Sequence, residues 1–119
     1  MTVTIYHNPR CSKSRKTLEI IEDAGLQPVI VEYLNEPPAA DTILWLASLL
    51  KVPVAELLRR GEAEYREARD LPDLEDDTAL AEWLSRNPKV LQRPIVVNEA
   101  QGRAVTGRPP ENVLPLVSR

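Results

Sequence analysis

The first 34 residues follow a strand–helix–strand pattern, which constrains the fold more than any other feature of the chain. Residues 3–6 alternate in polarity as a strand does, and residues 29–34 form a β-branched apolar run. Between them, residues 12–24 carry apolar side chains at helical spacing, and Gly25 follows as a typical C′ residue. Two strands joined by such a helix pair in parallel through a right-handed crossover. We therefore expect an α/β protein in which the strand over residues 29–34 is buried.

Residues 39–87 have the pattern of a helical segment. Asp41 is placed to cap a first helix, and residues 54–60 predict a second, short helix that Gly61 closes. The stretch 62–77 is dense in charge and poor in apolar side chains, so it is either a solvated helix or a loop.

Both tryptophans belong to this helical segment. A further helix begins at Asp77 or Thr78 and ends before Pro88. Trp45 and Trp83 fall on the apolar stripes of their helices, so we expect both side chains in the core.

The last third of the chain returns to β structure. Residues 93–98 and 103–106 predict two strands joined by a short turn, and strands so joined must pair antiparallel. A final helix is expected after Gly107. The order βαβ, helices, ββα is that of a thioredoxin-like α/β fold with a mixed four-stranded sheet. We expect a single domain over residues 1–119 with a helical insertion at about 39–87.

The amino-acid composition excludes several kinds of functional site. With one cysteine and one histidine, the 119-residue chain has no internal disulfide, no thiolate zinc cluster and no CxxC redox pair. A net charge of −3 gives no reason to expect nucleic acid or an anionic membrane as a partner. The sequence shows no membrane-length apolar run, signal peptide or coiled-coil seam, so we expect a cytoplasmic monomer.

The single cysteine, Cys11, lies where the first predicted strand turns into the first predicted helix. A helix start presents unpaired N–H groups and the positive end of the dipole, and both favour a thiolate or a bound oxyanion. His7, Lys13 and Arg15 could lower the pKa of the thiol further. A lone cysteine is often a small buried hydrophobe instead, but the polar and charged neighbours of Cys11 argue against a core position.

His7 has two interpretations that the sequence leaves open. It either tunes the Cys11 thiol or fills the end of a strand. As the only histidine, it cannot be part of an imidazole relay or of a histidine metal cluster.

Three arginines stand at junctions between predicted elements: Arg59, Arg93 and Arg108. In a thioredoxin-like layout, the loop that enters the third strand lies beside the start of the first helix, so we expect Arg93 near Cys11. Guanidinium groups form paired N–H···O bonds with oxyanions and stay charged at any working pH. Taken alone, each arginine is better explained as a solvated surface residue, or, in the case of Arg59, as a cation at a helix C-terminus.

Several motifs, in the same order along the chain, resemble the glutaredoxin-coupled arsenate reductases, a thioredoxin-like family related to the Spx-like proteins. The motifs are residues 6–15 followed by Thr17-Leu18, residues 32–34 with 37–38, Leu57-Leu58-Arg59, residues 93–96 and residues 107–111. The resemblance covers nearly the whole chain and is weakest over residues 62–77.

The resemblance implies roles for individual residues. Cys11 resembles the family's nucleophile, and His7 the residue that helps to hold it as a thiolate. Pro94 resembles the cis-proline of thioredoxin-like folds, and only X–Pro bonds adopt the cis form at low cost. The implied substrate-binding residues are Arg59, Arg93 and Arg108, which bind and polarise the oxyanion, together with Ser14 and Arg15 of the cysteine loop.

The activity so implied is the reduction of arsenate to arsenite, with glutathione as cosubstrate, glutaredoxin as protein partner and no bound metal or organic cofactor. One alternative is a glutathione-dependent thiol transferase or reductase that acts on another substrate. A second is a non-catalytic Spx-like regulatory module, which would sense redox state through a CxxC pair. In this chain Ser14 replaces the second cysteine of that pair.

Overall fold

The computed structural model describes residues 2–117, and the chain forms two compact units. One unit combines residues 1–33 with residues 93–119, and the other comprises residues 34–92. No helix within residues 2–117 is long and apolar enough to cross a membrane.

The first unit contains the predicted mixed four-stranded sheet, in the order β2-β1-β3-β4. Its strands are β1 (Val3–His7), β2 (Val29–Glu32), β3 (Ile95–Asn98) and β4 (Arg103–Thr106). β1 pairs with β2 in parallel, as the crossover helix requires, whereas β1–β3 and β3–β4 are antiparallel. The predicted fold class is thus confirmed.

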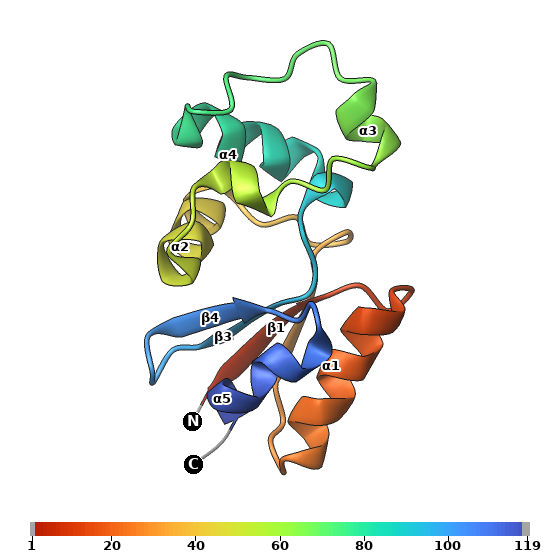
Figure 1. Cartoon of the computed structure of the whole chain (residues 1–119), viewed down its shortest axis with the longest axis vertical. Coiled ribbons are helices and arrows are strands. Elements are labelled where there is room, and N and C mark those ends of the chain that lie inside the picture. The colour runs from red at the N-terminus through yellow and green to blue at the C-terminus, as the bar shows by residue number, and fades with distance from the viewer. Residues whose placement is uncertain (1, 118–119) are drawn as a thin grey trace. The chain divides into compact units, whose positions relative to one another are not determined.

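Three helices pack on one face of this sheet (Figure 1): α1 (Ser12–Asp23), the 3₁₀ helix η3 (Pro110–Val113) and α5 (Leu114–Val117). Period-2 alternation in the strands directs one set of apolar side chains toward the helices. The resulting core contains Val3, Ile5, Ile21, Val96, Val113, Leu116 and Val117. The buried Asn98 side chain donates a hydrogen bond to the Leu116 carbonyl oxygen at 2.7 Å, which ties β3 to α5.

Helix α1 ends as the sequence predicts. Gly25 adopts a φ of +86°, and its N–H donates to the carbonyl oxygen of Glu22 at 2.9 Å. Glycine adopts this left-handed conformation without the steric cost of a Cβ, so it reverses the chain toward β2.

The prediction of a buried second strand was wrong. β2 ends at Glu32 rather than at residue 34, and Val29 and Ile30 are 52% and 45% exposed. The physical reason is the position of β2 at the edge of the sheet, where it has β1 as its strand neighbour on one side only. Tyr33, which follows the strand, is fully buried.

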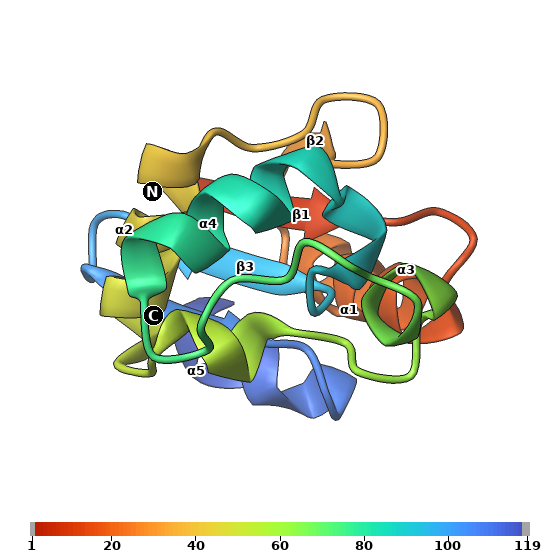
Figure 2. The same cartoon turned by 90° about the horizontal axis from the view of Figure 1, so that it is seen from above.

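The second unit is helical (Figures 1 and 2). Its elements are α2 (Ala40–Leu50), η1 (Val54–Leu57), α3 (Ala63–Arg66), α4 (Asp77–Arg86) and η2 (Pro88–Val90). Helices α2 and α4 pack against each other. Trp83 is 1% exposed, as predicted, and its Nε1–H donates to Asp70 Oδ1 at 3.0 Å. The charged stretch before α4 therefore supplies a hydrogen-bond acceptor for a core side chain.

Three expectations for this unit need correction. The N-cap of α2 is Ala39, and Asp41 lies within the first turn. The short helix ends at Leu57 instead of residue 60, because Leu58 leaves it to pair with Leu91 in an isolated β-bridge. Trp45 is 40% exposed rather than buried, because the apolar content of α2 extends beyond the face that packs.

Candidate active site

Cys11 is half-buried at the N-cap position of α1, with extended backbone angles (φ −95°, ψ 123°). A turn built on Asn8 holds it there. The Asn8 carbonyl oxygen accepts the Cys11 N–H at 3.0 Å, and Asn8 Oδ1 accepts the Arg10 N–H at 3.0 Å. This role of Asn8 was not predicted from the sequence, although Asn-Pro dipeptides favour the start of a turn.

The environment of Cys11 lowers the pKa of its thiol. Burial is the largest single effect and raises the pKa. The combined lowering effects exceed it: the backbone N–H groups of Ser14 and Lys13 at the start of α1 favour the thiolate, the Arg93 side chain donates a hydrogen bond, and Arg108 contributes a positive charge. Cys11 is therefore a thiol predisposed to ionise.

Arg93 and Arg108 both reach the sulfur. Nη2 of Arg108 lies 3.8 Å from Cys11 Sγ, while its Nε donates to the Arg93 carbonyl oxygen at 2.7 Å. The expectation that topology brings Arg93 beside Cys11 is met by its side-chain hydrogen bond to the thiol. The Arg93–Pro94 peptide bond is cis, as is the Arg108–Pro109 bond.

Gly107, the residue before Arg108, is closely packed against neighbouring segments. The Gly107 N–H donates to the Pro94 carbonyl oxygen at 2.9 Å. A Cβ on Gly107 would meet the Thr17 hydroxyl and lie 2.6 Å from Pro94 Cγ. Only glycine therefore allows α1, the Pro94 turn and the Arg108 segment to approach this closely. The spacing of Thr17 fits an ordinary helix position, so no sequence signal pointed to this contact.

His7 and Ser14 form a buried polar pair beside the cysteine turn. His7 Nδ1 lies 2.6 Å from Ser14 Oγ, which also accepts the Asn8 N–H at 3.1 Å. The pKa of His7 is lowered, mainly by burial and also by the charge of Arg15, while Glu32 acts in the opposite sense. The His7 ring is consequently neutral at neutral pH.

The two remaining arginines of the predicted site have partners of their own. Arg15 is exposed, and its Nη1 donates to the Pro9 carbonyl oxygen at 3.0 Å, which braces the cysteine turn. Arg59 belongs to the unit of residues 34–92, where its Nε lies 3.5 Å from Glu62 Oε1.

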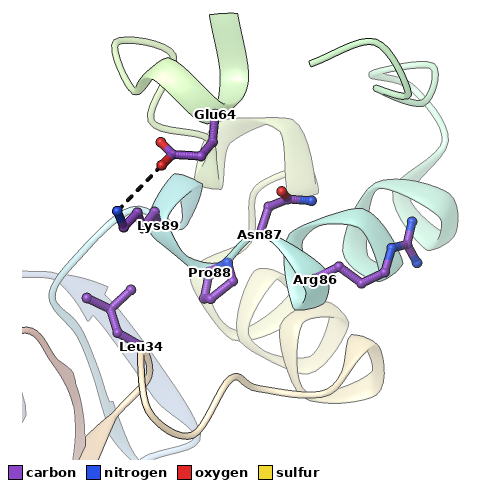
Figure 3. Close-up of a pocket in the computed structure, with 6 residues that line it drawn as sticks. All are labelled: Leu34, Glu64, Arg86, Asn87, Pro88 and Lys89. Atoms are coloured by element: carbon purple, nitrogen blue, oxygen red, sulfur yellow. Dashed lines mark ion pairs between the residues drawn. The ribbon is translucent and has the colours of Figure 1, made fainter. Parts of the chain in front are cut away.

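The helical unit also contains a pocket of about 290 Å³, shown in Figure 3, which no sequence prediction anticipated. Its lining residues are Leu34, Glu64, Arg86, Asn87, Pro88 and Lys89. Lys89 Nζ and Glu64 Oε1 lie 3.5 Å apart and form an ion pair at one side of the pocket. The Arg86 side chain points away from this ion pair. Within residues 2–117, no His, Cys, Asp and Glu side chains are grouped so that they could hold a metal ion.

The geometry around Cys11 suits nucleophilic attack on an oxyanion. A thiolate is the reactive form of cysteine, and the nearby guanidinium groups can stabilise negative charge on the attacked group.

Comparisons with known proteins give near-full-length matches. The chain matches the ArsC family over residues 6–116. It is 45% identical over 116 residues to the uncharacterized protein YfgD of Escherichia coli (strain K12), with 97% of this chain and 96% of that protein covered. It is 37% identical over 115 residues to the arsenate reductase of the same strain, with 97% of this chain and 80% of that protein covered.

A solved structure of an arsenate reductase from Vibrio cholerae superposes on the chain with a TM-score of 0.85 at 39% identity, covering 98% of both chains. The family match and this superposition extend over both β-rich parts of the sequence and over the helices between them. This chain therefore belongs to the ArsC family and has its thioredoxin-like fold.

Proposed function

We propose that this protein reduces arsenate to arsenite, with Cys11 as nucleophile and with glutathione and glutaredoxin as the source of electrons. The observation that carries the proposal is the environment of the Cys11 sulfur at the start of α1, where the Arg93 side chain donates a hydrogen bond to it and Arg108 Nη2 lies 3.8 Å away. Relatives named arsenate reductase in Escherichia coli and Haemophilus influenzae, 37% and 36% identical, support arsenate as the substrate.

The reaction begins when the Cys11 thiolate attacks arsenic(V). A sulfur–arsenic bond forms, and one arsenate oxygen leaves as water or hydroxide. The guanidinium groups of Arg93 and Arg108 stabilise the negative charge on the adduct, because charge-assisted hydrogen bonds to an oxyanion are stronger than neutral ones. We assign Arg59 to the same substrate on the resemblance of its motif.

The second step transfers two electrons to arsenic. Glutathione attacks the adduct, a disulfide forms between its sulfur and Cys11, and the sulfur–arsenic bond breaks to release arsenite. A glutaredoxin thiolate then removes the glutathione from Cys11. The chain contains one cysteine, so it has no second thiol to resolve the adduct internally.

A coupled assay tests this function. Purified protein, arsenate, glutathione, glutaredoxin, glutathione reductase and NADPH are mixed, and NADPH oxidation is followed with and without arsenate. We expect arsenate-dependent oxidation in the wild type and none in Cys11→Ser, because a serine hydroxyl ionises far too weakly to act as the nucleophile.

Two results would contradict the proposal. Turnover that persists in Cys11→Ser would show that Cys11 is not the nucleophile. Absence of turnover in a wild-type protein whose thiol still ionises below the ordinary cysteine range would exclude arsenate and favour thiol transfer to another substrate.

A further inference from the structure

Four basic residues lie next to Cys11 in the chain: Arg10, Lys13, Arg15 and Lys16. Residues 1–18 contain no acidic residue, although the net charge of the whole chain is −3. All four basic residues are exposed. The surface beside the cysteine therefore has a local positive charge in a protein that is acidic as a whole, and such a surface attracts anions.

Two of these four cations already have partners. Lys16 Nζ lies 3.7 Å from Glu19 Oε1, and Arg15 braces the cysteine turn through its bond to a backbone carbonyl oxygen. Within residues 2–117, Arg10 and Lys13 form no ion pair with a carboxylate. These two side chains are therefore the cations of the cysteine turn that stay available to an incoming anion.

Both available cations are close to the nucleophile along the backbone. Arg10 directly precedes Cys11, so their Cα atoms are about 3.8 Å apart, and the Arg10 N–H is held by Asn8 Oδ1 at 3.0 Å. Lys13 is the second residue of α1, in which each residue rises about 1.5 Å along the axis. Long, exposed side chains at these two positions can reach a ligand that meets the Cys11 sulfur.

These two cations differ from the two arginines that reach the sulfur. Arg93 and Arg108 are partly buried and contact the thiol, which suits a small oxyanion that the thiolate attacks. Arg10 and Lys13 are exposed and lie beside the thiol along the chain. Their positions suit a larger anion that arrives after the oxyanion and keeps part of its surface in solvent.

Glutathione has charges that fit this arrangement. It has a carboxylate at each end and a thiol between them, and an extended tripeptide spans about 10 Å. Its thiolate must approach an arsenic adduct that is itself negatively charged. Two cations beside the reaction centre offset the repulsion between these anions.

We propose, resting on the proposed function for the identity of the cosubstrate, that Arg10 and Lys13 bind the two carboxylates of glutathione and so direct its sulfur toward Cys11. The same two residues then serve a simpler reaction in the absence of arsenate. The Cys11 thiolate attacks one sulfur of oxidised glutathione, a disulfide forms between Cys11 and that half, and the other half leaves as a thiolate.

This reaction gives a test that needs neither arsenate nor glutaredoxin. The rate of disulfide formation at Cys11 is measured with oxidised glutathione, which is anionic, and with 2-hydroxyethyl disulfide, which is uncharged. The readout is the ratio of the first rate to the second. Because the same thiolate attacks both reagents, its fraction at a given pH cancels from the ratio.

The ratio should depend on the charges at two positions. We expect Arg10→Gln and Lys13→Gln each to lower it roughly 2- to 5-fold, the effect of one exposed ion pair, and the double variant roughly 5- to 20-fold. Arg10→Lys retains the charge and should keep most of the ratio. Raising the ionic strength should lower the wild-type ratio toward that of the double variant.

Lys16→Gln is the matched control. It removes a cation of the same helix that is already paired with Glu19, so the ratio should stay at the wild-type value. A loss in Lys16→Gln as large as that in Arg10→Gln would assign the effect to the general charge of the protein and overturn the site.

A double variant with the wild-type ratio would also overturn the proposal, since neither side chain would then bind glutathione. If glutaredoxin removed glutathione from Cys11 of that variant more slowly than from the wild type, the basic surface would instead fit an acidic protein. Failure of the proposed function is distinguishable, because it would abolish arsenate turnover in the coupled assay and leave the rate ratios as expected.

Discussion

Arg108 and Cys11 are 97 residues apart in the chain, yet Nη2 of Arg108 lies 3.8 Å from Cys11 Sγ. The same guanidinium donates from Nε to the Arg93 carbonyl oxygen at 2.7 Å. One side chain thus joins the turn before β3, the segment after β4 and the start of α1. The planar guanidinium holds its two N–H donors in a fixed geometry, so it can contact both groups at once. A single ammonium group cannot reproduce this double contact.

Replacing Arg108 by lysine should therefore impair the site while preserving its charge. We expect Arg108→Lys to raise the apparent pKa of Cys11 and to lower kcat/KM for arsenate roughly 10- to 100-fold, the range for a lost hydrogen bond to a charged group. Arg103→Lys, at an exposed position on β4, is the control and should leave both quantities unchanged. Wild-type kinetics in Arg108→Lys would mean that charge alone suffices.

Gly107→Ala should destabilise the first unit. A Cβ at this position would overlap the Thr17 hydroxyl and crowd Pro94, which costs about 1–3 kcal/mol when a packed interior must adjust. Denaturant unfolding measures the effect. Gly61→Ala is the matched control, because a Cβ there meets nothing within 4 Å. Equal free energies of unfolding for the two variants would show that the contact at Gly107 is not tight.

The two tryptophans should respond differently to replacement by phenylalanine. Trp83→Phe removes a buried indole and leaves Asp70 Oδ1 without its donor, so we expect a loss of about 1–3 kcal/mol in the free energy of unfolding. Trp45→Phe, at a position 40% exposed, should cost less than about 0.5 kcal/mol. A larger cost at Trp45 would indicate that its exposed face is covered in solution.

The buried histidine should make stability depend on pH. Because the pKa of His7 is lowered in the folded protein, the unfolded chain binds a proton first as the pH falls below about 6.5. The contribution of His7 to the free energy of unfolding is therefore fully present above that pH, and it decreases as the pH falls toward the lower folded-state pKa. We expect the Tm to fall from pH 7.5 to 5.5.

His7→Asn is the control for this dependence. The chain has one histidine, so the variant contains no imidazole, and its Tm should be flatter over the same range. If the Tm of His7→Asn changed with pH as steeply as that of the wild type, the dependence would come from carboxylates instead.

Local sequence signals predicted most of the element order. The alternation in residues 3–6, the helical spacing after Cys11 and the Gly25 C′ position each depend on neighbours within a few residues. For the same reason, the cysteine could be placed at a helix start and judged reactive before any contact was known. The charge-rich stretch before α4 gave no such signal, and the bond from Trp83 to Asp70 within it was not anticipated.

Tertiary packing decided which strand lies at the edge of the sheet and which face of a helix is buried. A β-branched run such as residues 29–34 reads the same in a central strand and in an edge strand, and only the strand order left Val29 and Ile30 exposed. Helix α2 is likewise mostly apolar, so its sequence predicted a buried Trp45. The face of the helix that packs in the structure does not include this residue.

The sequence by itself determined the fold class and the chemistry that a single thiol at a helix start favours, because both follow from residue type and short-range spacing. Only the tertiary structure decided how the side chains of Arg93 and Arg108 reach that thiol and which groups hold it in place. Arg108 approaches Cys11 because glycine at position 107 lets two distant segments meet, and His7 bonds to Ser14 because β1 and α1 converge at the cysteine turn. Long-range contacts of this kind depend on how the elements close around a common core, and no local pattern of residues encodes them.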